Sequence, residues 1–79
     1  MSERFGIVTR KPHLYDVVAL TENLPQQGLV RGQVGTIVEH YSPDAFEVEF
    51  VDNSGHTYAL VTLHSRQLLV LHYEPAQAA

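Results

Sequence analysis

The sequence contains no cysteine and no tryptophan, and only five of its 79 residues are lysine or arginine. Without cysteine the chain can form neither a disulfide framework nor a cysteine-ligated zinc site. A small domain without such cross-links is more typical of a reducing compartment than of secretion. We therefore expect a cytoplasmic protein that is stabilised by its hydrophobic core alone.

Long hydrophobic segments are missing as well. No apolar run approaches the roughly 20 residues that cross a bilayer. The N-terminal residues lack the apolar stretch of about 7–15 residues that marks a signal peptide. We expect no membrane anchor and no secretory leader. At this length we expect one domain with a thin core, and folding should bury roughly 60–65% of the surface that the unfolded chain exposes.

Positive charge is scarce. Nine acidic residues outnumber the five basic ones, which gives a formal net charge of −4. Between His13 and Tyr73 only Arg31 and Arg66 are basic, against seven acidic residues, so that part carries 2 − 7 = −5. A surface that follows phosphates needs clustered lysine and arginine. Binding to nucleic acid is therefore disfavoured, and a basic or apolar protein partner suits this charge better.

Two of the five glycines mark the most informative stretch. Gly32 and Gly35 lead into the β-branched run from Val34 to Val38. Glycine permits a positive φ or a close backbone approach, and β-branched residues favour strands. This pattern predicts a tight turn that passes into a sharply bent, buried strand. We assign structural turn roles to four glycines: Gly28, Gly32, Gly35 and Gly55.

Apolar residues alternate with a period of two, and no helical period is present. The clearest case is Phe46 to Val51, where apolar residues alternate with glutamates. Five strands are predicted, at residues 14–20, 34–40, 46–51, 56–63 and 68–73. A long loop with Leu24 and Leu29 turned inward follows the first strand. Turns are expected at 41–45 and 52–55, and a 3₁₀ turn at 64–67 precedes the last strand.

These elements predict an all-β fold, a five-stranded antiparallel small barrel over residues 13–73. Residues 1–12 are expected to form an N-terminal tail or an edge strand. Residues 74–79 are expected to form a disordered C-terminal tail.

The order of these elements resembles that of the SH3-like barrels. Within that class, four segments look like a bacterial family catalogued as domain of unknown function 4926. The segments are Leu14–Leu20, Leu24–Glu39, Phe46–Phe50 and Tyr58–Leu63. The resemblance covers roughly residues 13–71. It implies a fold, and because the family has no known activity it implies no chemistry.

Two further resemblances imply functions. The stretch from Arg31 to Ile37 is similar to part of the SH3-like domain of the nitrile hydratase β subunit. That domain packs against a metal-bearing α subunit, which implies a protein partner here. The glycine spacing in the same stretch also resembles the KOW motif of ribosomal and transcription-elongation proteins, which implies RNA binding. KOW modules usually carry several basic residues around the motif, whereas this chain offers mainly Arg31.

Residues that could support catalysis or metal binding form no recognisable motif. The five histidines lie at predicted strand ends and turns, without HxH or HExxH spacing. They are His13, His40, His56, His64 and His72. We predict scattered histidines, with a metal site or a pH-sensitive interface as alternatives. His64 and Ser65 are chain neighbours, which does not bring their side chains together for nucleophilic catalysis. We expect no enzyme and no cofactor.

Several side chains are candidates for contact with a partner protein. Glu39, Glu47 and Glu49 form an acidic stripe, either an ordinary solvated face or a docking surface for a basic segment. The strand at 56–63 is apolar on both faces, with Tyr58 and Leu60 on one of them. Four tyrosines could form an aromatic groove for proline-rich peptides. The candidate partner-binding residues are Arg31, Glu39, Glu47, Glu49, Tyr58 and Leu60.

The sequence therefore predicts a non-enzymatic small protein-binding module. We expect an antitoxin-like, immunity-like or accessory subunit of a bacterial protein complex. Its partner is another protein, and a homodimer that pairs through strand edges is a second arrangement. The alternative function is that of a KOW-like RNA-binding module.

Overall fold

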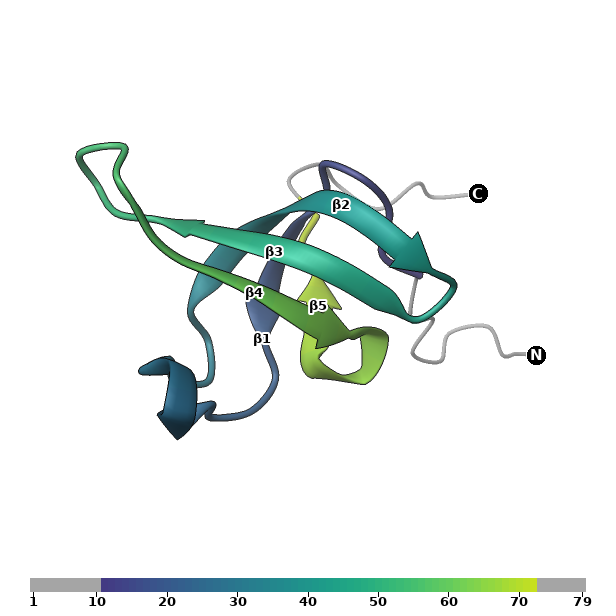
Figure 1. Cartoon of the computed structure of the whole chain (residues 1–79), viewed down its shortest axis with the longest axis horizontal. Coiled ribbons are helices and arrows are strands. Elements are labelled where there is room, and N and C mark those ends of the chain that lie inside the picture. The colour runs from purple at the N-terminus through teal and green to yellow at the C-terminus, as the bar shows by residue number, and fades with distance from the viewer. Residues whose placement is uncertain (1–10, 73–79) are drawn as a thin grey trace.

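The computed structural model describes residues 11–72 and is drawn in Figure 1. Its strands are β1 (Val17–Leu20), β2 (Val34–Ser42), β3 (Ala45–Val51), β4 (Thr57–His64) and β5 (Leu68–Val70). Two 3₁₀ turns accompany them, η2 (Pro25–Gln27) in the long loop and η3 (Ser65–Gln67) before β5. Neither is an α-helix, so the described part of the chain confirms the all-β prediction and the 3₁₀ turn before the last strand. It contains no helix that is long and apolar enough to span a bilayer.

All five strands belong to one antiparallel sheet with the order β4-β3-β2-β1-β5. The sheet is strongly bent, so that β2, β3 and β4 form one layer and β1 and β5 lie behind it (Figure 1). Two register shifts between β2 and β3 contribute to the bend. No hydrogen-bonded ladder joins β4 to β5 in the described residues. The fold is thus a small, open barrel rather than a closed one.

The core lies between the two layers. In β3 the buried residues are Phe46, Val48 and Phe50, which alternate with half-exposed glutamates as predicted. Leu24 and Leu29 are also buried, which confirms that the long loop turns inward. Their main chains bond to each other, with 2.8 Å from Leu24 N to Leu29 O. The buried cluster comprises Val18, Leu20, Leu24, Leu29, Ile37, Phe46, Val48, Phe50, Leu63, Leu68 and Val70.

The first strand is shorter than the predicted 14–20, because it begins at Val17. The residues before it form a turn in which the Asp16 N–H donates to His13 O at 3.0 Å. The Asp16 carboxylate in turn accepts from the His13 N–H at 2.8 Å. Tyr15 has φ +70° in this turn, and both Leu14 and Tyr15 are exposed. Local hydrogen bonds from an aspartate therefore replace the strand that the apolar pattern predicted.

The other boundaries differ by smaller amounts. The turn predicted at 41–45 is only Pro43 and Asp44, because Ser42 and Ala45 already pair across the hairpin. The fourth strand begins and ends one residue later than predicted, and β5 ends at Val70. The proposed tail or edge strand at 1–12 lies almost wholly outside the described residues, and Lys11 and Pro12 are not in a strand. The predicted tail at 74–79 also lies outside them.

The glycines fall into two groups. Gly28, Gly32 and Gly55 have φ values of +71°, +92° and +87°, as turn residues do. Gly35 instead lies inside β2, so its assignment to a turn is wrong. A Cβ atom on Gly35 would lie 2.7 Å from Val48 Cγ1 and 2.9 Å from the Glu49 carbonyl oxygen. Gly35 is therefore required by the close approach of β3, not by its own backbone conformation.

The variant Gly35→Ala tests this close approach. The new methyl group has no room against β3, so we expect a loss of about 1–3 kcal/mol in the free energy of unfolding. Urea unfolding followed by circular dichroism measures the loss. The control is Gly55→Asn, since the space around Gly55 is open and asparagine tolerates a positive φ. Equal stability of Gly35→Ala and the unmodified protein would contradict the assignment.

Candidate functional site

The strand β4 forms one edge of the sheet, and no described strand pairs with its outer side. It is eight residues long, with the sequence TYALVTLH, and contains no aspartate, glutamate, lysine, arginine or proline. Natural edge strands are usually short, or carry charges or proline that block pairing with another chain. The opposite edge, β5, has only three residues. The edge along β4 is therefore the place where the sheet is most open to a further strand.

The layer formed by β2, β3 and β4 has an outer face, which consists of the side chains that point away from the core. On this face Glu49 lies between Thr36 and Leu60 of the neighbouring strands. Glu47 lies between Glu39 and Thr62 in the same way. The side chain of Leu60 is 57% exposed. Four of the predicted partner-binding residues, Glu39, Glu47, Glu49 and Leu60, are thus brought together here.

Threonines of β4 hold two of these carboxylates. The Thr62 hydroxyl donates to Glu47 Oε1 at 2.7 Å. The Thr57 hydroxyl donates to Glu49 Oε2. Both donors belong to the edge strand, so the two carboxylates are drawn from β3 toward β4. The negative charges of Glu47 and Glu49 therefore lie next to the edge strand β4.

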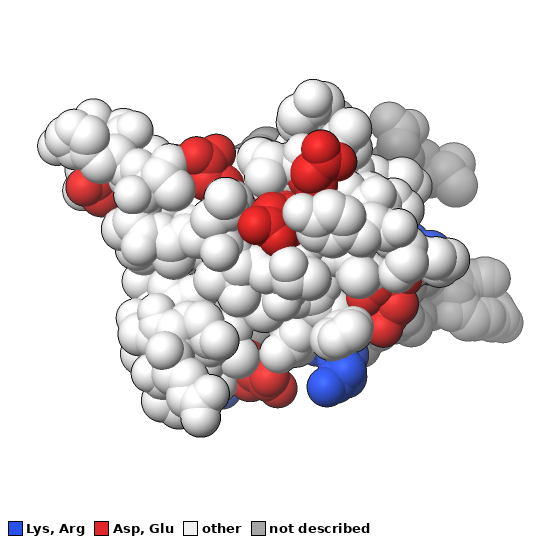
Figure 2. Space-filling model, viewed as in Figure 1, with Lys and Arg blue, Asp and Glu red and all other residues white. Residues whose placement is uncertain are grey.

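Within the described residues, no cation balances the carboxylates of the outer face. The ion pairs among residues 11–72 all join a histidine to an aspartate, so no lysine or arginine of this part pairs with Glu39, Glu47 or Glu49. Figure 2 shows acidic side chains spread over this side of the molecule, whereas the basic ones visible in the view lie at its margin. Glu39 also stands directly opposite Glu47, and like charges in such positions destabilise a sheet. Stability of the sheet alone does not explain this arrangement.

The pKa of the Tyr41 hydroxyl is raised in part by the carboxylates of the outer face. Partial burial raises the pKa of its hydroxyl, and the neighbouring carboxylates of Glu47 and Glu39 raise it further. A negative group added to this face would be disfavoured for the same reason, whereas a positive one would be favoured.

Tyr58 and Arg31 lie elsewhere. A register shift near the start of β4 leaves Tyr58 without a residue directly opposite it on β3. The centre of its ring lies 6.2 Å from that of the buried Phe50. The Tyr58 hydroxyl accepts from Gln33 Nε2 at 3.1 Å, at the loop before β2. Arg31 is in that loop, and its main-chain N–H donates to Asn23 Oδ1 at 2.9 Å. Tyr58 of β4 thus contacts the loop before β2, in which Arg31 lies, whereas the other four candidates share the outer face.

The predicted aromatic groove does not form as a single surface. Tyr41 lies near the end of β2, whereas Tyr58 bonds to Gln33, which precedes the first residue of β2. Tyr15 lies in the turn before β1, and Tyr73 is outside the described residues. The three described tyrosines thus lie in separate parts of the fold instead of lining one groove.

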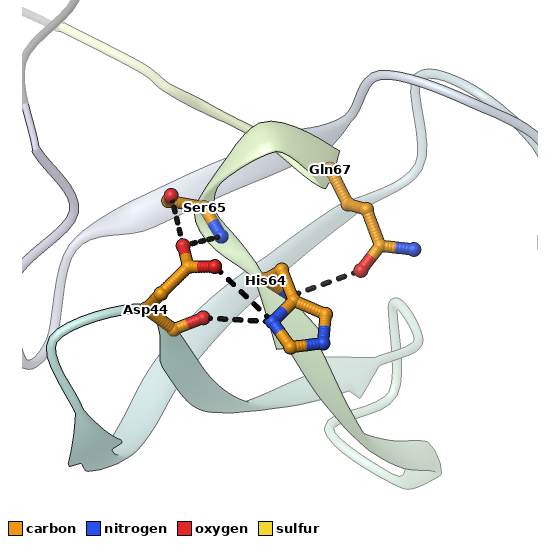
Figure 3. Close-up of polar contacts among 4 residues, drawn as sticks. All are labelled: Asp44, His64, Ser65 and Gln67. Atoms are coloured by element: carbon orange, nitrogen blue, oxygen red, sulfur yellow. Dashed lines mark hydrogen bonds and ion pairs between the residues drawn. The ribbon is translucent and has the colours of Figure 1, made fainter.

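A polar cluster that the sequence did not reveal joins the β2–β3 turn to η3 (Figure 3). The Asp44 carboxylate accepts from the Ser65 N–H at 3.0 Å and from the Ser65 hydroxyl. His64 Nδ1 lies 3.0 Å from the Asp44 carbonyl oxygen and 3.3 Å from Asp44 Oδ2. Gln67 Oε1 accepts from the His64 N–H at 2.9 Å. No simple sequence signal relates Asp44 to Ser65, since they are 21 residues apart.

The cluster contains the residue types of a catalytic triad in a different arrangement. A triad requires the serine hydroxyl to bond to the histidine, which takes up its proton. Here the Ser65 hydroxyl donates to Asp44, as does the Ser65 main chain. These contacts satisfy the start of the 3₁₀ turn in the manner of a helix cap. The geometry is that of a structural tie between η3 and the hairpin.

The histidines are distributed singly over the described residues. In three of them the Nδ1 atom lies within 4.0 Å of the Oδ2 atom of one aspartate. The distances are 3.9 Å for His13 and Asp16, 3.8 Å for His56 and Asp52, and 3.3 Å for His64 and Asp44. His40 stacks on Phe46 with 4.6 Å between ring centres. Among residues 11–72 no three side chains of the metal-binding types gather into a candidate site.

A groove of about 420 Å³ lies beside the end of β2, between residues 11–13 and 40–43. Its wall includes Lys11, where the described part of the chain begins. We assign it no ligand.

The whole fold from the turn before β1 to β5 matches one known family. Residues 14–70 match the family described as Domain of unknown function (DUF4926). The chain belongs to the DUF4926 family. This confirms the resemblance drawn from the sequence, and the match includes every candidate partner-binding residue. No curated protein and no solved structure matches the chain. The SH3-like assignment and the resemblances to nitrile hydratase and KOW domains stay predictions.

The hydrogen bonds between Asp44 and η3 should shift the pKa of the Asp44 carboxyl in this DUF4926 domain. The hydrogen bonds from the Ser65 hydroxyl and N–H lower the pKa of the Asp44 carboxyl, and His64 lowers it further. The ionised form is the one favoured by folding. Its contribution to stability is therefore present above the ordinary aspartate pKa of 3.8 and is lost as the pH falls through the lower folded-state pKa.

We expect a carboxyl-carbon NMR titration to place the Asp44 midpoint below 3.8. In Ser65→Ala the hydroxyl donor is lost, so the midpoint should rise toward the ordinary value. His64→Gln should raise it less, because the charge of His64 is a smaller cause of the shift than the bonds from Ser65. An unshifted Asp44 in the unmodified protein would contradict the tie.

Proposed function

We propose that this DUF4926 domain is a non-enzymatic protein-binding module, whose partner docks on β4 and the adjacent outer face. The observation that carries the proposal is the edge strand itself. Its eight residues include no lysine, arginine, aspartate, glutamate or proline, and Leu60 is exposed in the middle of it. A partner segment that pairs with such an edge gains main-chain hydrogen bonds and buries apolar side chains. The domain would then act as an antitoxin-like, immunity-like or accessory subunit of a protein complex.

Two observations support a binding role over catalysis. The Ser65 hydroxyl is used to bond Asp44, which ties η3 to the hairpin. On the outer face the Glu47 and Glu49 carboxylates accept hydrogen bonds from Thr62 and Thr57, and the exposed Leu60 lies beside them. An acidic face around an exposed apolar residue resembles the mixed surfaces that proteins use to recognise one another.

RNA binding of the KOW kind has less support. Arg31 is exposed in the loop before β2, as such a role requires. The described residues contain three lysines and arginines against seven acidic residues, a net charge of 3 − 7 = −4. The phosphate backbone of RNA would be repelled by that charge.

A photo-reactive residue at position 60 tests the docking surface. With p-benzoylphenylalanine in place of Leu60, irradiation of host cells should yield a cross-linked product that contains a second protein. The matched control carries the same residue at Leu69, which is 54% exposed on the opposite edge strand β5. We expect the product from position 60 and not from position 69. No product from position 60, or equal yields from both positions, would contradict the proposal.

RNA binding is tested separately by fluorescence anisotropy with a short labelled RNA. We expect no binding at about 50 mM salt, where electrostatic contacts to phosphates are strongest. Binding that weakens with added salt and in Arg31→Ala would favour the KOW-like alternative.

A further inference from the structure

We infer that the partner of β4 is an extended segment in which apolar and basic residues alternate, and that it adds to the open edge as a further strand. The inference rests on the proposed function, because it names the chemistry of the segment that docks. It uses three features of the site, namely the edge of β4 that no described strand covers, the inner side of β4 and the carboxylates of the outer face.

The main chain of β4 determines the shape of the segment. A strand that pairs with an edge must itself be extended, and its side chains then point alternately to the two faces of the sheet. Half of the residues of the segment would therefore meet the inner side of β4, and the other half the outer face.

The inner side of β4 favours apolar residues. Ala59 and Val61 are only partly buried, although both pack against the core. Both belong to β4, which no described strand joins to β5. Apolar side chains of an added strand would extend the core at this point and remove Ala59 and Val61 from water.

The outer face favours basic residues. Leu60 and Thr62 would be the nearest outward neighbours of an added strand, and Glu49 and Glu47 lie opposite them on β3. Neighbouring strands are about 4.8 Å apart, so a long lysine or arginine side chain on the added strand can extend across β4 to these carboxylates. The β4 hydroxyls already hold both carboxylates on the near side. No lysine or arginine among residues 11–72 pairs with them.

A second copy of the chain fits this edge less well. It would present the same uncharged β4 and would satisfy the main-chain hydrogen bonds. It would bring no positive charge to Glu47 and Glu49, however, and the net charge would double from −4 to −8. Charge complementarity therefore favours a basic segment from a different protein.

Two labelled eight-residue peptides test the inference, with lengths matched to β4. One alternates lysine and valine, and the other has the same composition in two blocks, four lysines followed by four valines. We expect the alternating peptide to bind more tightly in fluorescence anisotropy, and to shift the amide resonances of β4 rather than those of β5. Equal affinity of the two peptides, resonance shifts at β5, or no binding of either peptide would overturn the inference.

Variants of the domain test the role of the carboxylates. In Glu47→Gln/Glu49→Gln we expect about tenfold weaker binding of the alternating peptide, as the loss of two partly screened ion pairs predicts. The control Glu22→Gln/Asp52→Asn removes the same charge away from the outer face and should weaken binding less than about twofold. Equal effects of the two pairs would mean that net charge alone attracts the peptide, which overturns the inference.

The oligomeric state tests whether a second copy of the chain occupies the edge of β4. Sedimentation equilibrium of the unmodified protein should give a monomer, because the edge of β4 binds a segment of a different protein and not a second copy. A dimer that Leu60→Lys dissociates would assign the edge to a second copy and overturn the inference. A cross-link from position 60 to a partner without an alternating basic strand would also overturn it, while leaving the proposed function in place.

Discussion

The close approach of β2 and β3 at Gly35 is the contact on which the shape of the domain depends. Gly35 pairs with Val18 of β1, and the next residue, Thr36, pairs with both Val17 of β1 and Glu49 of β3. One strand thus joins both layers of the barrel. It can do so only if its backbone lies close to β3, where a Cβ atom on Gly35 would collide. A side chain at this single position would therefore push β2 away from β3.

Among residues 11–72 no strand covers either edge of the bent sheet. The two edges differ in length. The strand β5 has three residues and follows a 3₁₀ turn, whereas β4 has eight residues and contains no aspartate, glutamate, lysine or arginine. An edge of that length exposes a row of unpaired main-chain donors and acceptors in an otherwise small domain. The acidic outer face lies directly beside it. The binding surface that we propose is therefore a product of the topology as much as of particular side chains.

Much of the fold could be predicted from the sequence, because it depends on short-range patterns. The alternation in β3 and the inward turn of Leu24 and Leu29 follow from apolar spacing alone. The acidic residues of the outer face could also be assigned to neighbouring strands. The bond between Asp44 and Ser65 could not be predicted, since it joins positions that only the folded chain brings together. Tyr58 was placed with Leu60 by simple alternation, and the register shift in β4 gives it different neighbours.

The turn before β1 sets the alignment of that strand. The main-chain N–H of Tyr15 donates to the Ile37 carbonyl oxygen at 2.7 Å, and the Ile37 N–H donates to the Asp16 carbonyl oxygen at 3.0 Å. Both bonds act on one residue of β2, so they fix which residues of β1 and β2 stand opposite each other. A slip by one residue would turn Val18 and Leu20 out of the core. The left-handed backbone of Tyr15 is unfavourable by roughly 1–2 kcal/mol for a residue with a side chain. The domain tolerates this conformation because the turn that contains it fixes the single register in which β1 pairs with β2.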